Sequence, residues 1–125
     1  MPKLWIAGSR DFPQLELAAR FIRDVPHILW PQAMREEIEI LEGGARGVDQ
    51  LAGMIAKDEG FGLRVLPAQW DKYGRSAGMI RNEKLAQEAH ALLAFWDGKS
   101  RGTEHSIELA RAKGIPVVLV EVRED

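Results

Sequence analysis

The residues best suited to chemistry form a glycine turn between a predicted strand and a predicted helix. The turn runs from Glu42 to Asp49 and reads EGGARGVD. Its glycines let the backbone adopt positive φ angles and let a ligand approach the amides, while the following helix offers free N–H groups and the positive end of its dipole. This arrangement favours an anion, most naturally a phosphate. The alternative is a tight connection in which the glycines serve packing alone.

A second group of candidates consists of cationic side chains expected at the same edge of the domain. They are Arg10, Arg46, Arg75, Arg81, Lys99 and Arg101. Arg81 is the most informative because it lies one turn after Ala77 and one turn before Leu85, beside the stripe that faces the sheet. An arginine there needs an anion, which is either a ligand or a local carboxylate such as Glu83 or Asp97, unless the side chain extends to the surface.

Two further kinds of side chain follow predicted strands. Thr103 can cap a helix, and Gly102 lets a ligand approach the first amides of that helix. Trp70 and Trp96 could stack on a base, although tryptophans at strand ends more often close the core. Asp49 or Asp97 could accept hydrogen bonds from ribose hydroxyls.

Five apolar segments are typical of buried strands and would position these residues. The segments are Leu4 to Ala7, the stretch around Ile38 and Ile40, Leu63 to Leu66, Ala91 to Trp96 and Ile115 to Val120. The segment Ala91 to Trp96 is the most apolar of them, which makes it the predicted central strand.

Four helical patterns alternate with the strands. They cover Gln14 to about Asp24, the segment from the glycine turn to a C-cap at Gly60, Arg75 to Ala89, and Glu104 to Lys113 with a C-cap at Gly114. The first helix is expected to stop before Pro26, and His27 to Ala33 is predicted to be a loop. The charged tail from Glu121 to Asp125 is expected to be solvated.

This alternation predicts a Rossmann-like α/β fold: one doubly wound, three-layer domain over residues 1–125 with a five-stranded, mainly parallel sheet. Ligands of such sheets bind outside the carboxyl ends of the strands, near the point where the winding direction reverses. The rule gathers onto one rim the segments 8–10, 43–49, 69–70, 97–98 and 102–103.

Composition excludes several function classes. The chain has 125 residues and no cysteine, so disulfides, thiolate metal ligands and a cysteine nucleophile are excluded. The three histidines lack ligand spacing, and no metal is expected. Without a membrane span or a signal peptide we expect a soluble, cytoplasmic protein with no membrane partner. The net charge of −2 argues against a general nucleic-acid coat.

Two nucleotide-binding motifs are absent. Gly98, Lys99 and Ser100 imitate the end of a P-loop, but Leu93 stands where that motif needs a glycine. The first strand is followed by Gly8, Ser9 and Arg10, which lack the dinucleotide fingerprint. Ordinary NAD chemistry is therefore unsupported, and no cofactor is required.

Five segments together resemble the SLOG superfamily, in particular its small YspA/YpsA-like, often phage-borne branch. They are GSRDF (8–12), GGARGVDQLA (43–52), PAQW (67–70), AGMIRN (77–82) and AFWDGKSRGT (94–103). The resemblance implies a Rossmann-like domain that binds nucleotides or nucleotide-derived ligands. Better-known relatives are the DNA-processing protein DprA and the LOG phosphoribohydrolases.

The resemblance to LOG enzymes stops at a definite place. Their pattern is an arginine on a helix, an apolar strand, Pro-Gly-Gly-x-Gly-Thr and two glutamates needed for N-glycosidic hydrolysis. Arg81, the strand and Gly98 to Thr103 match in order, but Trp96-Asp97-Gly98 replaces Pro-Gly-Gly. His105 and Ser106 stand at the glutamate positions. The phosphate-binding half of the site is retained, while the hydrolytic half lacks its glutamates.

Three functions remain open, of which the favoured one is a nucleotide-binding or sensing module. Its predicted ligand-binding residues are Gly8, Ser9, Arg10, Gly43, Gly44, Ala45, Arg46, Asp49, Trp70, Arg81, Asn82, Asp97, Gly98, Gly102 and Thr103. The alternative is an N-glycosidic hydrolase in which Arg81 holds the phosphate and Glu104, Asp97 or Asp49 is the acid or base. DprA-like single-stranded DNA binding is less favoured. A homo-oligomer is also left open.

Overall fold

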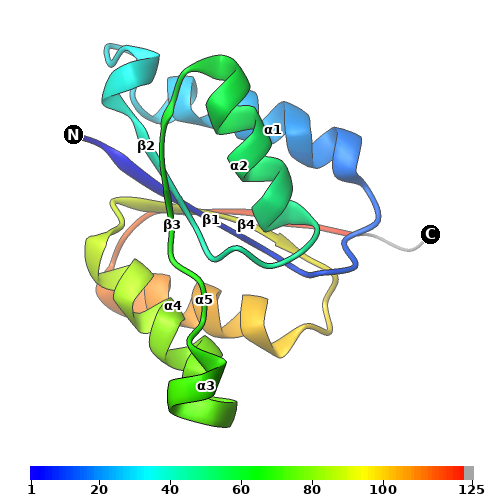
Figure 1. Ribbon diagram of the computed structural model, residues 1–125. Coiled ribbons are helices and arrows are strands. Elements are labelled where there is room, and N and C mark those ends of the chain that lie inside the picture. The colour runs from blue at the N-terminus through cyan, green and yellow to red at the C-terminus, as the bar shows by residue number, and fades with distance from the viewer. Residues whose placement is uncertain (123–125) are drawn as a thin grey trace.

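The computed structural model describes residues 1–122 of the chain. Its strands form one all-parallel sheet in the order β3-β2-β1-β4-β5 (Figure 1). The strands are β1 (Lys3–Gly8), β2 (Glu39–Glu42), β3 (Gly62–Val65), β4 (Ala91–Trp96) and β5 (Val117–Glu121). The predicted Rossmann-like α/β fold with a five-stranded parallel sheet is confirmed.

Helices cover both faces of the sheet. They are α1 (Leu15–Leu29), α2 (Val48–Glu59), α3 (Trp70–Tyr73), α4 (Ala77–Glu88) and α5 (Arg101–Lys113), with 3-10 turns at Arg35–Glu37 and Gly74–Ser76. Figure 1 shows α1 and α2 on one face and α4 and α5 on the other. None of the helices among residues 1–122 has the length and apolar character needed to cross a membrane.

The core follows from the alternation of side chains along the inner strands. Leu4 and Ile6 of β1 belong to the apolar cluster under α1 and α2, whereas Trp5 and Ala7 belong to the cluster under α4 and α5. Neighbouring β4 alternates in the same way, which explains why its sequence is apolar at every position.

The prediction that Ala91–Trp96 is the central strand is wrong, since β1 occupies the centre of the sheet. Continuous apolarity reports burial on both faces, and an inner strand beside the centre meets that condition equally well. The winding direction reverses between β1 and β4. There the Ser9 N–H donates to Phe95 O (2.9 Å) and the Asp97 N–H donates to Ser9 Oγ (3.2 Å), so the loops after both strands lie side by side.

The first helix does not stop before Pro26 as predicted but continues to Leu29, so the predicted loop begins later than His27. A proline inside a helix removes one hydrogen bond and costs about 3 kcal/mol. Here Val25 and Pro26 are buried against the core, and the Trp30 N–H closes the last turn on Pro26 O (3.0 Å). Tertiary packing offsets the local preference of proline.

The last helix begins at Arg101 rather than Glu104, and its N-cap is Ser100 rather than Thr103. The Asp97 carboxylate causes this, because its Oδ1 accepts the N–H groups of Lys99 and Ser100 (2.8 Å each) and folds the loop into a turn. The predicted C-caps are correct, with left-handed glycines at Gly60 and Gly114. Of the predicted charged tail, Glu121 ends β5, and residues 123–125 lie outside the described residues.

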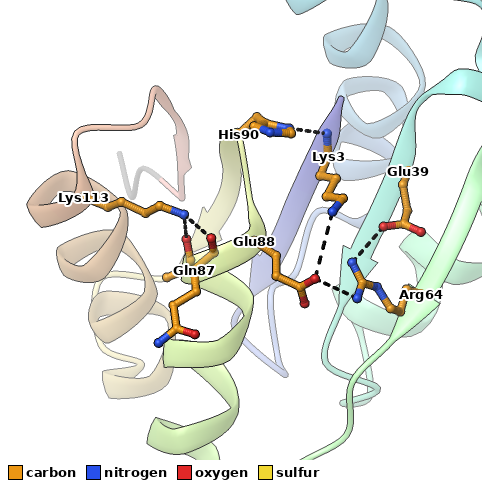
Figure 2. Close-up of polar contacts among 8 residues, drawn as sticks. Lys3, Glu39, Arg64, Gln87, Glu88, His90 and Lys113 are labelled. Carbon is orange, nitrogen blue, oxygen red and sulfur yellow. Dashed lines mark hydrogen bonds and ion pairs between the residues drawn. The ribbon is translucent and has the colours of Figure 1, made fainter. Parts of the chain in front are cut away.

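Polar contacts tie the elements together at the amino edge of the sheet (Figure 2). Arg64 of β3 pairs with Glu39 of β2 (3.0 Å) and with Glu88 at the end of α4 (2.8 Å), and Lys3 of β1 lies 4.0 Å from the same Glu88 carboxylate. Lys113 at the end of α5 donates to the carbonyl groups of Ala86 and Gln87. The opposite edge of the sheet, at the carboxyl ends of the strands, is formed by loops.

Close packing between β1 and α2 gives a first prediction. A Cβ atom at Gly8 would lie 2.5 Å from the buried Val48 Cβ, so we expect Gly8→Ala to push α2 from the sheet and to lower the free energy of unfolding by about 1–3 kcal/mol. The control is Gly102→Ala, where a Cβ meets nothing within 4 Å. Urea denaturation measures both. Equal free energies of unfolding for Gly8→Ala and the unmodified protein would show that α2 can shift to accept the added methyl group without loss of stability.

Candidate functional site

A cavity of about 670 Å³ opens at the carboxyl edge of the sheet, on the face covered by α4 and α5. The loops after β1 and β4 contribute to its wall, so it lies at the reversal of winding where ligands of this fold class bind. The charged side chains around it are Arg10, Asp11, Asp49, Arg75, Arg81, Asp97, Lys99 and Arg101. Cations outnumber carboxylates in this wall, although the whole chain is net acidic.

The structure brings most of the predicted site residues to this cavity. Those that line it are Gly8, Arg10, Gly43, Ala45, Asp49, Trp70, Arg81, Asn82, Asp97, Gly102 and Thr103. Trp70 is half-exposed, whereas Trp96 is partly buried and donates its indole N–H to Ser100 O (3.0 Å). The interpretation of Trp96 as a residue that closes the core therefore fits. Trp70 is the exposed tryptophan of the cavity wall, which also includes the buried Trp5.

Four predicted ligand-binding residues and one catalytic candidate lie outside the cavity. Ser9 is buried at the β1–β4 junction, and Arg46 pairs with Asp11 on the surface (3.3 Å). Gly44 turns its N–H to a carboxylate of the protein, and Gly98 forms the exposed turn after β4 with a φ of 81°. Glu104 is exposed on the outer side of α5.

Sequence reasoning missed several residues of the wall. They include Asp11, Gly78, Met79, Ser100, His105 and Ser106. The residues from α5 follow helical spacing, since Gly102, Thr103, His105 and Ser106 share the face that begins at the Ser100 N-cap. Recognising Ser100 as the N-cap would have added His105 and Ser106 to the predicted Gly102 and Thr103.

The glycine turn is filled by the protein's own carboxylates. The Gly44 N–H donates to Glu42 Oε1, and the Ala45 N–H donates to Asp49 Oδ2 (3.2 Å). The two amides at which a phosphate is expected are thus already bonded to carboxylates of the protein in this structure. A glycine-rich turn that exposes donors serves an internal carboxylate as well as an external anion, and the sequence pattern is the same for both.

Gly43 makes room for Arg81 of α4. A Cβ atom at position 43 would lie 2.2 Å from Arg81 Nη1 and 3.0 Å from Asp49 Oδ2. In the space that glycine leaves, Arg81 Nη1 donates to Gly43 O (2.8 Å) and Nε donates to Asn82 Oδ1 (2.8 Å). Two neutral oxygen atoms thus orient the guanidinium group.

The charge of Arg81 has no direct ion pair among the described residues, and neither Glu83 nor Asp97 serves as its partner. Burial lowers the pKa of Arg81, while the nearby carboxylates of Asp49 and Glu42 act in the opposite direction. The guanidinium group is therefore fixed at the cavity wall, partly buried, with its charge incompletely compensated.

Burial also acts on the two carboxylates of the turn. It raises the pKa of Glu42 to about 7 and that of Asp49 to about 6, against hydrogen bonds from the Gly44 and Ala45 amides that favour the charged forms. Asp49 lines the cavity, whereas Glu42 lies behind it against α2. In the described part of the chain no three His, Asp or Glu side chains are grouped so that they could hold a metal ion.

No protein-family model matches the chain. The gene 61 protein of Mycobacterium phage D29 is 39% identical to it over 85 residues, which make up 63% of this chain and 68% of the phage protein. The chain belongs to the family of this gene 61 protein. The phage origin of that relative agrees with the phage-borne relatives that the motifs imply.

Solved structures similar to this member of the gene 61 family include two DprA proteins. The DprA of Streptococcus pneumoniae superimposes with a TM-score of 0.73 at 19% identity over 95% of this chain, and the chain spans 50% of that protein. The DprA of Helicobacter pylori, whose structure concerns single-stranded DNA binding, superimposes with a TM-score of 0.69 at 17% identity. The match covers 99% of this chain and 67% of the Helicobacter protein. The structural-genomics target TM1055 superimposes with a TM-score of 0.59 at 19% identity, and the match covers 94% of this chain and 72% of TM1055. These likenesses establish a DprA-like fold.

The buried carboxylates predict a pH dependence of stability. Because folding raises the pKa of Glu42 from 4.5 to about 7, the folded state holds this proton more tightly than the unfolded state. The favourable contribution of Glu42 to the free energy of unfolding is therefore fully present below pH 4.5. It falls by about 3 kcal/mol as the pH rises through about 7. Glutamine keeps an acceptor for the Gly44 N–H without the charge. We expect Glu42→Gln to match the unmodified protein at pH 4 and to exceed its free energy of unfolding by about 3 kcal/mol at pH 8.

Urea denaturation from pH 4 to pH 8 measures this difference, with the exposed Glu108→Gln on α5 as the control for loss of one charge. A difference between Glu42→Gln and the unmodified protein that stays constant over this range would contradict the assignment of Glu42 as a buried, protonatable group.

Proposed function

We propose that this gene 61 family protein is a binding or sensing module that takes a nucleotide or a nucleotide-derived phosphate ligand in the cavity. The observation that carries the proposal is Arg81. Its guanidinium group is held at the cavity wall by Gly43 O and Asn82 Oδ1, and it forms no ion pair with the described carboxylates. A partly desolvated cation in a fixed position is a strong site for a phosphate oxygen.

The start of α5 supports an anion at the same place. Gly102 and Thr103 line the cavity in the first turn of this helix, whose dipole favours negative charge at its N-terminus. No atom lies within 4 Å of a Cβ built at Gly102, so the approach to the first turn is open. Arg10 and Lys99 add positive charge to the wall.

The cavity also offers an apolar wall for a base. Trp70 is 51% exposed and Met79 is 54% exposed, and both line the cavity. An indole ring is a good platform for a flat aromatic group. A volume of about 670 Å³ lies within the range of sites for small molecules and exceeds what a lone phosphate needs.

The candidate acids and bases give the hydrolase alternative little support. Glu104 lies outside the cavity. Hydrogen bonds from the N–H groups of Ser100 and Lys99 hold the pKa of Asp97 below its ordinary value, which makes it a poor proton donor. Asp49, with a pKa near 6, is the remaining candidate, and it already accepts the Ala45 N–H.

Single-stranded DNA is the second candidate ligand. The Helicobacter pylori DprA is described as a single-stranded DNA-binding protein and shares the fold. Exposed Trp70 beside the cationic wall has the character of a base-stacking platform on a DNA-binding surface. We further propose that the gene 61 family belongs to the YspA/YpsA-like branch of the SLOG superfamily, on the strength of the five motifs.

The test is calorimetric titration with AMP, ADP, ATP, ADP-ribose, NAD, cyclic nucleotides and a short single-stranded oligonucleotide. We expect at least one nucleotide to bind, and Arg81→Ala to weaken that binding by about 10- to 150-fold, because a hydrogen bond to a charged group contributes about 1.5–3 kcal/mol. Arg111→Ala removes one exposed charge from α5 outside the cavity and should bind normally.

The same mixtures, separated by chromatography after incubation, distinguish the alternatives. Free base and ribose phosphate would establish hydrolysis, and binding of the oligonucleotide alone would favour the DNA-binding role. Equal affinity of the Arg81→Ala and Arg111→Ala variants would remove Arg81 from the site. Absence of binding to every compound would overturn the proposed function.

A further inference from the structure

Asn82 links Arg81 to a histidine of the same cavity. Its side chain lies on α4 and is 6% exposed. Its Oδ1 accepts from Arg81 Nε (2.8 Å), and its Nδ2 lies 3.3 Å from Gly102 O and 3.4 Å from His105 Nδ1. One buried amide therefore contacts the central cation of the site, the first turn of α5 and the imidazole ring of His105.

Chemistry fixes the orientation of this amide. The Nε of arginine can only donate, so the amide atom that faces it must be the oxygen. The amide nitrogen then points to Gly102 O, which can only accept, and this contact agrees with the same orientation. Both neighbours select a single orientation, with Nδ2 directed at His105.

The orientation of Asn82 selects one tautomer of His105. Because the amide nitrogen donates, His105 Nδ1 must accept, and the ring proton of the neutral imidazole lies on Nε2. His105 lines the cavity, and none of the hydrogen bonds among residues 1–122 uses its Nε2 atom. A neutral N–H donor is thereby left free at the cavity wall, two hydrogen bonds away from Arg81.

We infer that His105 is a ligand-binding residue that donates its Nε2–H to a phosphate oxygen of the ligand, and that Asn82 is the positioning residue that holds both donors. The inference rests on the proposed function for the ligand. It adds that one amide presents two donors of different charge, Arg81 and neutral His105, to neighbouring oxygen atoms of a phosphate ester or a diphosphate.

The first test reads the tautomer without any ligand. Long-range proton–nitrogen NMR correlation at pH 8 should show His105 protonated at Nε2. In Asn82→Asp one carboxylate oxygen still accepts from Arg81 and the other accepts from the ring, so the proton should move to Nδ1 of His105. His90 is the internal control, because its Nδ1 accepts the Lys3 N–H (3.0 Å) at the far edge of the sheet and should keep its Nε2 proton in both proteins (Figure 2). A His105 ring protonated at Nδ1 in the unmodified protein would overturn the role of Asn82.

The second test measures binding of inorganic phosphate and AMP. His105→Phe keeps a flat ring without the donor and should weaken both by about tenfold or more. His105→Gln restores an N–H donor and should recover part of the affinity. The control is His27→Phe, which changes a ring that packs beside Phe61 outside the cavity and should leave the affinity unchanged. Unchanged binding in His105→Phe, with a loss in Arg81→Ala, would overturn the role of His105 and leave the proposed function intact. If the unmodified protein binds neither phosphate nor AMP, the role of His105 is overturned, and if it also binds none of the compounds of the calorimetric series, the proposed function is overturned as well.

Discussion

The contact between Arg81 and the backbone of Gly43 is the constraint on which the rest of the site depends. It joins α4 on one face of the sheet to the loop between β2 and α2, and it requires a residue without Cβ at position 43. Burying a guanidinium group is costly unless its N–H groups are satisfied, and the Gly43 carbonyl and the Asn82 amide supply acceptors. Because both acceptors are neutral, the charge stays available.

The carboxylates of the same loop are arranged to complement that charge without neutralising it. Glu42 and Asp49 direct their oxygen atoms to the loop amides, which explains how two acidic side chains can lie close together in a buried place. The glycine turn is consequently bonded internally and supports the site, and the open donors of the site come from α4 and the start of α5.

Much of the fold was accessible from the sequence because it depends on local signals. Strand alternation, C-cap glycines and the spacing of helices were enough for the parallel doubly wound sheet. Pro26 and the N-cap of α5 were mispredicted for a physical reason: burial of Pro26 and the Asp97 turn are tertiary or loop-level effects that single-residue preferences do not contain. The place of β1 at the centre depends on strand order, which apolarity alone does not specify.

The site was predictable in its location and only partly in its chemistry. Arg81 and Asp49 stood out because charged residues lay beside apolar stripes or glycine turns. The sequence could not show that the turn amides meet internal carboxylates, since that depends on side-chain rotamers of Glu42 and Asp49. His105 stood out only because it occupies the position of a missing glutamate, and its place in the wall follows from a helix that begins at Arg101 with Ser100 as its N-cap.

The all-parallel sheet has a practical consequence for handling the protein. Pro2, beside the start of β1, accepts the Glu39 N–H at the edge opposite the cavity, whereas the Val122 N–H bonds Trp96 O beside the end of β4. Figure 1 shows the start of the chain, in blue, and the end of the described residues, in red, on opposite sides of the molecule. A purification tag, a fluorophore or a sensor surface attached through the amino terminus therefore leaves the mouth of the cavity facing solution. Val122 lies at the carboxyl edge of the sheet, the edge at which the cavity opens, so the amino terminus is the better point of attachment.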